Sequence, residues 1–118
     1  MDKEVIKIAN CSGYYGDKLS AAKELVDGGP IDVLTGDYLA ELTMAILYGQ
    51  KIQRGDDKGY VGTFLKQIKD VAAGCKEKKI KIVSNAGGLN PKSMAAEIEK
   101  ILDELSIDLK VAYIDGDD

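Results

Sequence analysis

The sequence predicts an α/β fold, with a mostly parallel open sheet of about four strands and helices flanking it. Short apolar segments rich in Val and Ile alternate with longer segments in which apolar residues recur every three or four positions. Each short segment runs into a small polar cluster, as strands do before a crossover helix. The 118 residues suffice for one domain but are few for a complete doubly wound enzyme. We therefore expect a single, incomplete, Rossmann-like α/β domain over residues 1–118.

The first half of the chain supplies two predicted strands and two predicted helices. Residues 5–9 and 31–34 are short apolar runs, which favour strands. Between them, residues 19–26 carry a helical apolar pattern that ends at Gly28-Gly29-Pro30. Residues 38–53 form the next predicted helix, which is apolar around most of its circumference. Such a helix is expected to lie between the sheet and further protein.

The second half continues the alternation. Residues 61–75 carry apolar positions at three- and four-residue steps, and a lysine-rich turn follows them, which suits a helix C-terminus. Cys75 falls on this apolar pattern, so we expect it in the core. Residues 80–84 are the next predicted strand. Asn90 and Pro91 suit the N-cap and first position of the last helix, and residues 109–114 complete the sheet.

Four polar loops follow the predicted strands, and they form the candidate site. Parallel strands joined by right-handed crossovers end at the same edge of a sheet, where open α/β sheets bind ligands. We therefore expect the four loops to gather there. The ligand-binding candidates that they contribute are Asn10, Ser12, Gly13, Gly16, Asp17, Thr35, Gly36, Asn85, Gly87, Gly88 and Asn90.

Two of the acidic residues are candidates for catalysis. Asp37 and Asp115 each follow a predicted strand, and a carboxylate there could act as an acid or base. Helix capping is an alternative role for Asp17, Asp37 and Asn90, since these residue types are good N-caps. Gly87 and Gly88 precede a helix N-terminus, where exposed backbone amides can receive an anion.

Composition excludes several kinds of site. The chain has no histidine, which excludes a Ser-His-Asp triad and a Cys-His pair, and its two cysteines lack a zinc spacing. Gly13 and Gly16 supply only the second half of a dinucleotide fingerprint, because Cys11 stands at the first glycine position. Carboxylates at the loop edge would suit a hard divalent ion such as Mg²⁺, with Asp37, Asp115 and Asp117 as its ligands.

Net charge and hydropathy limit the kinds of partner that the chain can bind. A net charge of -4 argues against nucleic acid, whose phosphates favour dense Lys and Arg. No apolar run approaches the roughly 20 residues that cross a bilayer, and the sequence starts without a signal-peptide pattern. We expect a cytoplasmic protein with neither a nucleic-acid nor a membrane partner.

The loop motifs resemble one family. Its signature segments are Asn10-x-Ser12-Gly13-x-Tyr15-Gly16-Asp17, residues 28–44, Asn85-Ala86-Gly87-Gly88-Leu89-Asn90-Pro91 and Asp115-Gly116-Asp117-Asp118. Together they are similar to the amino-terminal part of the acyclic terpene utilisation AtuA family, and the resemblance covers essentially the whole chain. Proteins of that family are several times longer. The resemblance therefore implies an N-terminal portion or a naturally split small subunit.

The resemblance also implies a field of chemistry. The family is named after bacterial gene clusters that degrade citronellol and geraniol through CoA thioesters. The resemblance implies that the chain is part of an enzyme that acts on an acyl-CoA or branched carboxylic acid by lyase or hydratase chemistry. The alternative is a non-catalytic ligand-binding or scaffolding subunit. In either case we expect a homo-oligomer or a complex with a second subunit, because an unpaired sheet edge readily recruits another chain.

Overall fold

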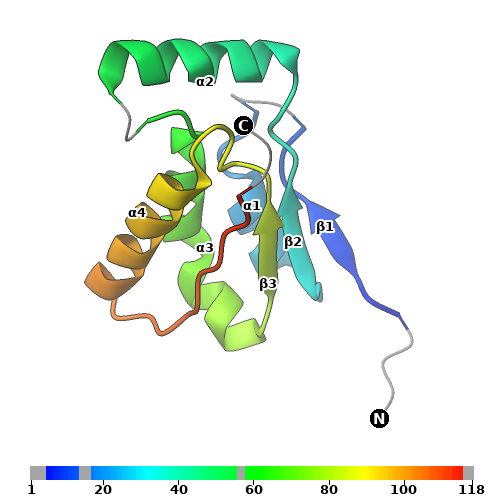
Figure 1. Ribbon diagram of the computed structural model, residues 1–118. Helices are drawn as coiled ribbons and strands as arrows, with labels where there is room; N and C mark the ends of the chain where they lie inside the picture. Colours follow the sequence, from blue (N-terminus) through cyan, green and yellow to red (C-terminus); the bar gives the residue numbers. More distant parts are fainter. Residues whose placement is uncertain (1–4, 14–16, 56–57, 116–118) are drawn as a thin grey trace.

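The computed structural model describes residues 5–13, 17–55 and 58–115. Within these residues it has three strands and four helices in the order of Figure 1. They are β1 (Ile8–Asn10), α1 (Ala21–Gly28), β2 (Val33–Gly36), α2 (Glu41–Arg54), α3 (Gly62–Lys78), β3 (Lys81–Ser84) and α4 (Pro91–Glu104). Each corresponds to a predicted element, with ends that differ by a few residues. The predicted α/β class is confirmed.

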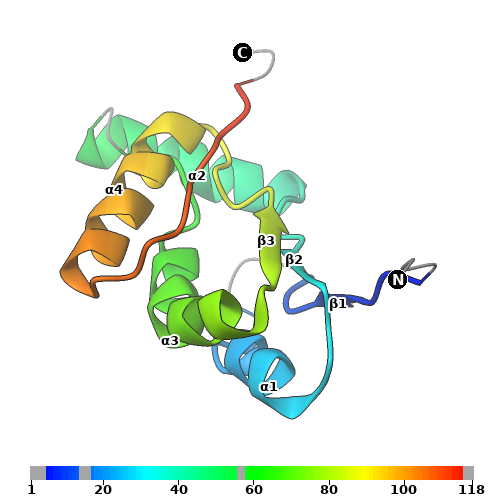
Figure 2. The same cartoon turned by 90° about the horizontal axis from the view of Figure 1, so that it is seen from below.

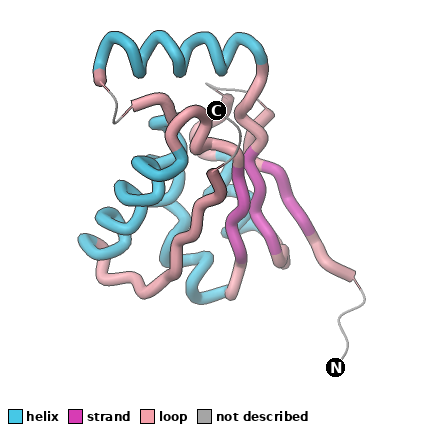
Figure 3. Tube along the Cα trace, viewed as in Figure 1, coloured by secondary structure: helices cyan, strands magenta, loops and turns pink. Residues whose placement is uncertain are grey.

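The sheet is parallel throughout, with the strand order β1-β2-β3 (Figure 3). Ala9, Leu34 and Ile82 lie side by side across the strands and face the helices. The neighbouring row, Ile8, Val33 and Lys81, therefore lies on the opposite face, because successive side chains of a strand alternate.

The prediction of a fourth strand is wrong, because residues 109–114 form no strand in the described part of the chain. Figures 1 and 2 place this segment between α4 and β3. Its start is held by the helices, because Ile107 N donates to Leu102 O and Lys76 Nζ donates to Asp108 O. Leu109 and Val111 pack against the core. The alternating pattern therefore reflects packing on the core rather than pairing with β3.

The helices α1 and α3 pack against each other on one face of the sheet (Figure 2). Right-handed crossovers between neighbouring strands of this order place both helices on the same side. The apolar pattern of α3 is buried as predicted, with Cys75 only 1% exposed. The opposite face has no helix over it in the described part, and Ile8 and Val83 are 65% and 61% exposed there.

The helix α2 lies across the carboxyl ends of the strands (Figure 1). It begins at Glu41, three residues later than the sequence predicted. Its inner side buries Thr43 and Leu47. Its outer side exposes large apolar residues, which explains why the sequence is apolar around the helix. No helix of the described part is long and apolar enough to cross a bilayer.

Candidate functional site

Three of the four predicted loops meet at the carboxyl edge of the sheet and are hydrogen-bonded to one another. Cys11 N donates to Thr35 O at 2.8 Å, and Asp37 N donates to Ser12 O at 2.9 Å, which ties the loop after β1 to the loop after β2. Asn85, after β3, then donates from Nδ2 to Asp37 Oδ1 at 2.8 Å. This edge brings together residues far apart in the sequence, as the parallel topology requires.

Asp37 presents an exposed carboxylate at the centre of this edge. Asn85 orients it, because Asn85 Oδ1 accepts a hydrogen bond from Tyr38 N at 2.8 Å while its Nδ2 binds the carboxylate. The capping alternative for Asp37 is wrong, since the N-cap of α2 is Ala40. The position of Asp37 therefore has no explanation in helix capping, and its carboxylate is held in place by a neighbouring strand end.

Asn10 of β1 and Thr35 of β2 form one side of this edge. Thr35 Oγ1 lies 3.2 Å from Asn10 Oδ1 and 3.5 Å from Ala9 O. The hydroxyl donates to the Asn10 oxygen, so the Asn10 amide nitrogen is directed away from Thr35. Asn10 is exposed. Its amide group is therefore a hydrogen-bond donor available beside the Asp37 loop.

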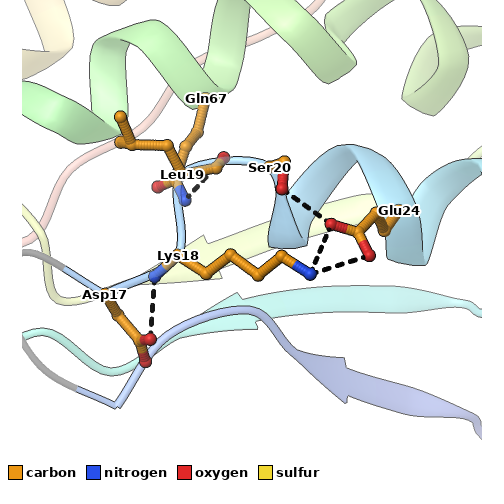
Figure 4. A network of polar contacts seen from close by, with 6 residues as sticks. All are labelled: Asp17, Lys18, Leu19, Ser20, Glu24 and Gln67. Carbon is orange, nitrogen blue, oxygen red and sulfur yellow. Dashed lines mark hydrogen bonds and ion pairs between the residues drawn. The ribbon is translucent and has the colours of Figure 1, made fainter.

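Asp17 closes the loop after β1 instead of capping α1. Its carboxylate accepts from Gly13 N at 3.0 Å and from Lys18 N at 2.8 Å, and these bonds lower the pKa of Asp17. Figure 4 shows the Lys18 contact and the start of α1 beyond it. The N-cap of α1 is Ser20, so the capping alternative for Asp17 is wrong. Gly16 lies outside the described residues.

A buried polar network lies beneath these loops, and sequence reasoning missed it. The Tyr38 hydroxyl donates to Gln67 Oε1 and lies 3.7 Å from Cys11 Sγ. Gln67 Nε2 in turn donates to Leu19 O at 3.5 Å (Figure 4). Tyr38 is 2% exposed and Gln67 3%. The sequence signal was the one polar residue among the buried positions of α3.

Burial makes this network resistant to ionisation. Burial raises the pKa of the Tyr38 hydroxyl far above its ordinary value. Burial also raises the pKa of the Cys11 thiol, and the Tyr38 hydrogen bond only partly opposes the rise. A protonated, buried thiol is a poor nucleophile. Burial and a raised pKa therefore favour a supporting role for Cys11 beneath the loops over a role as nucleophile.

Gly36 is explained by the same network. A Cβ at this position would lie 2.5 Å from Tyr38 Cε2, so only glycine lets the Tyr38 ring fold back over the end of β2. The ring also packs edge-on against Phe64, with the ring centroids 5.7 Å apart. Gly36 thus has a packing role, and its predicted ligand contact stays a prediction.

The amide of Gly88 is hydrogen-bonded within the chain, although the sequence predicted it to be free, and the ligand role of Gly87 stays a prediction. Gly88 N donates to Asn85 O at 3.1 Å, and Leu89 N donates to Gly59 O at 2.8 Å. The expectation of an anion cradle is wrong for these two amides, because the first is bonded within the turn and the second to the connection that follows α2. Gly88 has φ +55°, and a Cβ there would lie 2.5 Å from Leu47 Cδ1. The glycine is needed for backbone conformation and for packing under α2.

Asn90 caps α4 as the sequence predicted. Its Oδ1 accepts from Ser93 N at 3.3 Å, and Pro91 is the first helical residue. Its Nδ2 donates to Lys58 O at 3.0 Å. These contacts account for the amide side chain of Asn90 by structural means, so a ligand role for it stays a prediction.

The predicted metal site is not assembled in the described part of the chain. Asp115 is exposed near the end of that part, and Asp117 lies outside it. No group of three or more His, Cys, Asp or Glu side chains among the described residues could hold a metal ion. The roles of Asp115 and Asp117 therefore stay predictions.

A hollow of about 620 Å³ lies at the other end of the sheet. Lys7, Pro30, Asp32 and Lys78 are among its lining residues. It is at the amino ends of the strands, away from Asp37, and Lys7 N and Lys78 Nζ are already bonded to Asp32 Oδ2 and Val26 O. We place the candidate site at the carboxyl edge because the linked polar side chains gather there.

The comparison with protein families decides what the chain is. The family model described as "Acyclic terpene utilisation family protein AtuA" matches residues 6–118. The chain belongs to the AtuA family. In this AtuA chain, the segments that carried the resemblance include Asn10, Thr35, Asp37 and Asn85, the residues that meet at the carboxyl edge. No curated protein and no solved structure matches the chain.

Proposed function

We propose that this chain forms the ligand-binding edge of an AtuA-family enzyme. In this proposal the enzyme acts on an acyl-CoA or branched carboxylic acid intermediate of acyclic terpene degradation, by lyase or hydratase chemistry. The observation that carries the proposal is the Asp37 carboxylate, exposed at the sheet edge and held by Asn85 Nδ2 at 2.8 Å. The family match supports the substrate class.

The chemistry assigned to Asp37 is proton transfer. A lyase or hydratase removes a proton from carbon or from water and returns one, and a positioned carboxylate can do both. Asn85 keeps one oxygen of Asp37 in a fixed direction, so the carboxylate needs no reorganisation to meet its substrate. Asn10 supplies an amide donor for a thioester or carboxylate oxygen. The Gly88 and Leu89 amides have no part, because they donate to Asn85 O and Gly59 O.

Asp37→Asn tests this assignment. Asparagine keeps the size of the side chain and removes its basicity, and the exposed position makes a stability change above about 0.5 kcal/mol unexpected. We expect turnover of a branched acyl-CoA to fall at least about 100-fold, the usual contribution of a general base, in the assembly that contains this chain. Asp103→Asn, an exposed change on α4, is the matched control and should keep full activity. Full activity in Asp37→Asn would remove Asp37 from the mechanism.

A divalent ion at the same edge belongs to this proposal. Carboxylates of Asp37, Asp115 and Asp117 would suit Mg²⁺, which prefers oxygen ligands. Calorimetric titration of the chain with Mg²⁺ measures this directly. Binding that Asp37→Asn abolishes and Asp103→Asn leaves intact supports a metal site, and absence of binding heat removes the ion from the proposal.

A second candidate function is that of a non-catalytic ligand-binding or scaffolding subunit. The open sheet face favours it, since Ile8 and Val83 are exposed where a doubly wound sheet carries helices. Under this reading the chain acts within a longer family protein or beside a second subunit. Co-purification with a second polypeptide, and acyl-CoA binding without turnover in the assembly that contains this chain, would favour it over the catalytic proposal.

A further inference from the structure

The first turn of α2 carries backbone amides that need an acceptor. The first N–H groups of a helix lack an intrahelical partner, and the side chain of the N-cap residue often binds one of them. The N-cap of α2 is Ala40, whose side chain makes no such bond. Met44 N donates to Ala40 O at 2.9 Å, but the amides of Glu41, Leu42 and Thr43 have no acceptor among the described residues. Three donors are therefore available at the start of this helix.

Thr43 adds a hydroxyl to these amides. Its side chain is buried, with the residue only 3% exposed, yet its hydroxyl makes no hydrogen bond within the described part of the chain. Every fully enclosed side-chain N or O atom of that part has a partner, so the small exposed area of Thr43 includes its hydroxyl oxygen. Side chains of a helix lean towards its N-terminus, which directs Thr43 towards the free amides. Polar groups of buried residues are normally bonded, so this hydroxyl points to a bound partner.

These donors lie beside the candidate site. We call the amides of Glu41, Leu42 and Thr43 and the Thr43 hydroxyl the α2 donor set. Figure 1 shows the start of α2 above the end of β2. Three residue steps separate Asp37 from Ala40, so their Cα atoms are at most about 11 Å apart. A small ligand that contacts Asp37 can therefore also reach the α2 donor set.

The charges around the α2 donor set favour a ligand with a single negative charge. Residues 37–50 contain no Lys or Arg, and both Asp37 and Glu41 are exposed. Glu41 and Thr43 lie about 200° apart around the helix, so the Glu41 carboxylate leaves from the opposite side. The helix N-terminus offers about half a positive charge. It can offset part of one negative charge, but a doubly charged phosphate would need a cation that this segment does not supply.

We propose that the α2 donor set binds the carboxylate group of a small organic acid. One carboxylate oxygen accepts from the Thr43 hydroxyl, and the other accepts from the amides of the first turn, as anions do at helix N-termini. The choice of a branched acid as the ligand rests on the proposed function. Binding by these donors does not require proton transfer by Asp37, so the two proposals can fail separately.

Titration of the isotopically labelled full chain with isovalerate, a branched monocarboxylate, tests the proposal by nuclear magnetic resonance. We expect saturable shifts of the Glu41, Leu42 and Thr43 amide signals. The Ser93 amide at the start of α4 should shift less, because it already donates to Asn90 Oδ1. Isovaleramide has the same shape without the charge. It should bind at least about tenfold more weakly, since it cannot form charge-assisted hydrogen bonds.

Thr43→Val separates ligand binding from packing. Valine has nearly the same shape and lacks the hydroxyl, so we expect the isovalerate affinity to fall about tenfold, as for loss of one hydrogen bond to a charged group. The melting temperature should not fall, because the hydroxyl has no partner within the described residues. Thr43→Ser keeps the hydroxyl and should bind like the wild type. Thr63→Val, the same change in the first turn of α3, is the matched control and should also bind like the wild type.

Several results would overturn the proposal. They are an absence of isovalerate binding, stronger binding of inorganic phosphate than of isovalerate, shifts confined to other helix starts, and unchanged affinity in Thr43→Val. If Thr43→Val does not fold, the amide shifts of the wild type and the affinity of Thr43→Ser decide instead. These experiments measure binding alone, so their failure leaves the turnover test of Asp37→Asn unaffected. Loss of turnover in Asp37→Asn likewise leaves the binding result standing.

Discussion

At the residue scale, the most informative position is Tyr38, which joins the candidate site to the core. Its backbone amide donates to Asn85 Oδ1 at 2.8 Å, and its hydroxyl donates to Gln67 Oε1. The residue before it is Asp37. Because the Tyr38 ring is buried and the hydroxyl is bonded, the backbone at Asp37 has little freedom. The direction of the Asp37 carboxylate therefore depends in part on the buried side chain of Tyr38.

Tyr38→Phe tests this dependence. The change keeps the ring and leaves Gln67 without its hydroxyl partner, and a buried amide that loses a partner costs about 1–3 kcal/mol. We expect a loss of that size in urea unfolding. Adding Gln67→Met, which removes the other polar group, should recover part of it. Tyr48→Phe, a change at a 61% exposed tyrosine, should leave stability unchanged. If Tyr38→Phe also left the free energy of unfolding unchanged, the stabilising role of the buried network would be contradicted.

At the element scale, the turn between β3 and α4 holds α2 over the sheet edge. Leu89 N donates to Gly59 O and Val61 N donates to Ala86 O, which fixes the connection that follows α2. Leu47, the fully buried residue of α2, packs on Gly88. The glycine turn therefore positions the elements around the candidate site by packing against them.

Gly88 lies in crowded surroundings and Gly49 in open space, and this difference gives a prediction. Gly88→Ala adds a methyl group 2.5 Å from Leu47 Cδ1 at φ +55°, so we expect destabilisation of at least about 1 kcal/mol. Gly49→Ala adds one in open space within a helix, so we expect the isolated chain to gain up to about 1 kcal/mol. Thermal unfolding of both variants at low protein concentration makes the comparison. Similar melting temperatures would contradict the packing at Gly88.

The sequence predicted elements better than it predicted the site. The apolar periods of α1, α3 and α4 and the three strand segments are local patterns, and the structure confirms them. Residues 109–114 have an equally good alternating pattern, but pairing depends on a neighbouring strand that the segment does not engage. The Gly88 amide was misjudged for a similar reason, because its partner, the Asn85 carbonyl, is set by the fold of the turn.

At the scale of the whole molecule, the two sides of the sheet differ. One side carries α1 and α3 over a core of Val26, Leu34, Val71 and Cys75, and the other leaves Ile8 and Val83 exposed. The packing of α1 and α3 on β2 therefore comes from one apolar layer. Unfolding of the chain must expose that layer, including the buried thiol of Cys75.

The pH dependence of the free energy of unfolding should report the burial of Cys75 in this layer. Burial raises the pKa of Cys75 from 9.0 to about 11. The folded state therefore favours the protonated thiol, whose contribution is complete below pH 9 and is lost as pH rises towards 11. The loss is at most about 3 kcal/mol, since one pKa unit corresponds to about 1.4 kcal/mol. Cys75→Ala removes this group, so its free energy of unfolding should fall less than that of the wild type between these pH values. Urea unfolding at pH 8, 9.5 and 10.5 makes the measurement, and parallel pH curves for the two proteins would show that Cys75 ionises as freely in the folded chain as in the unfolded one.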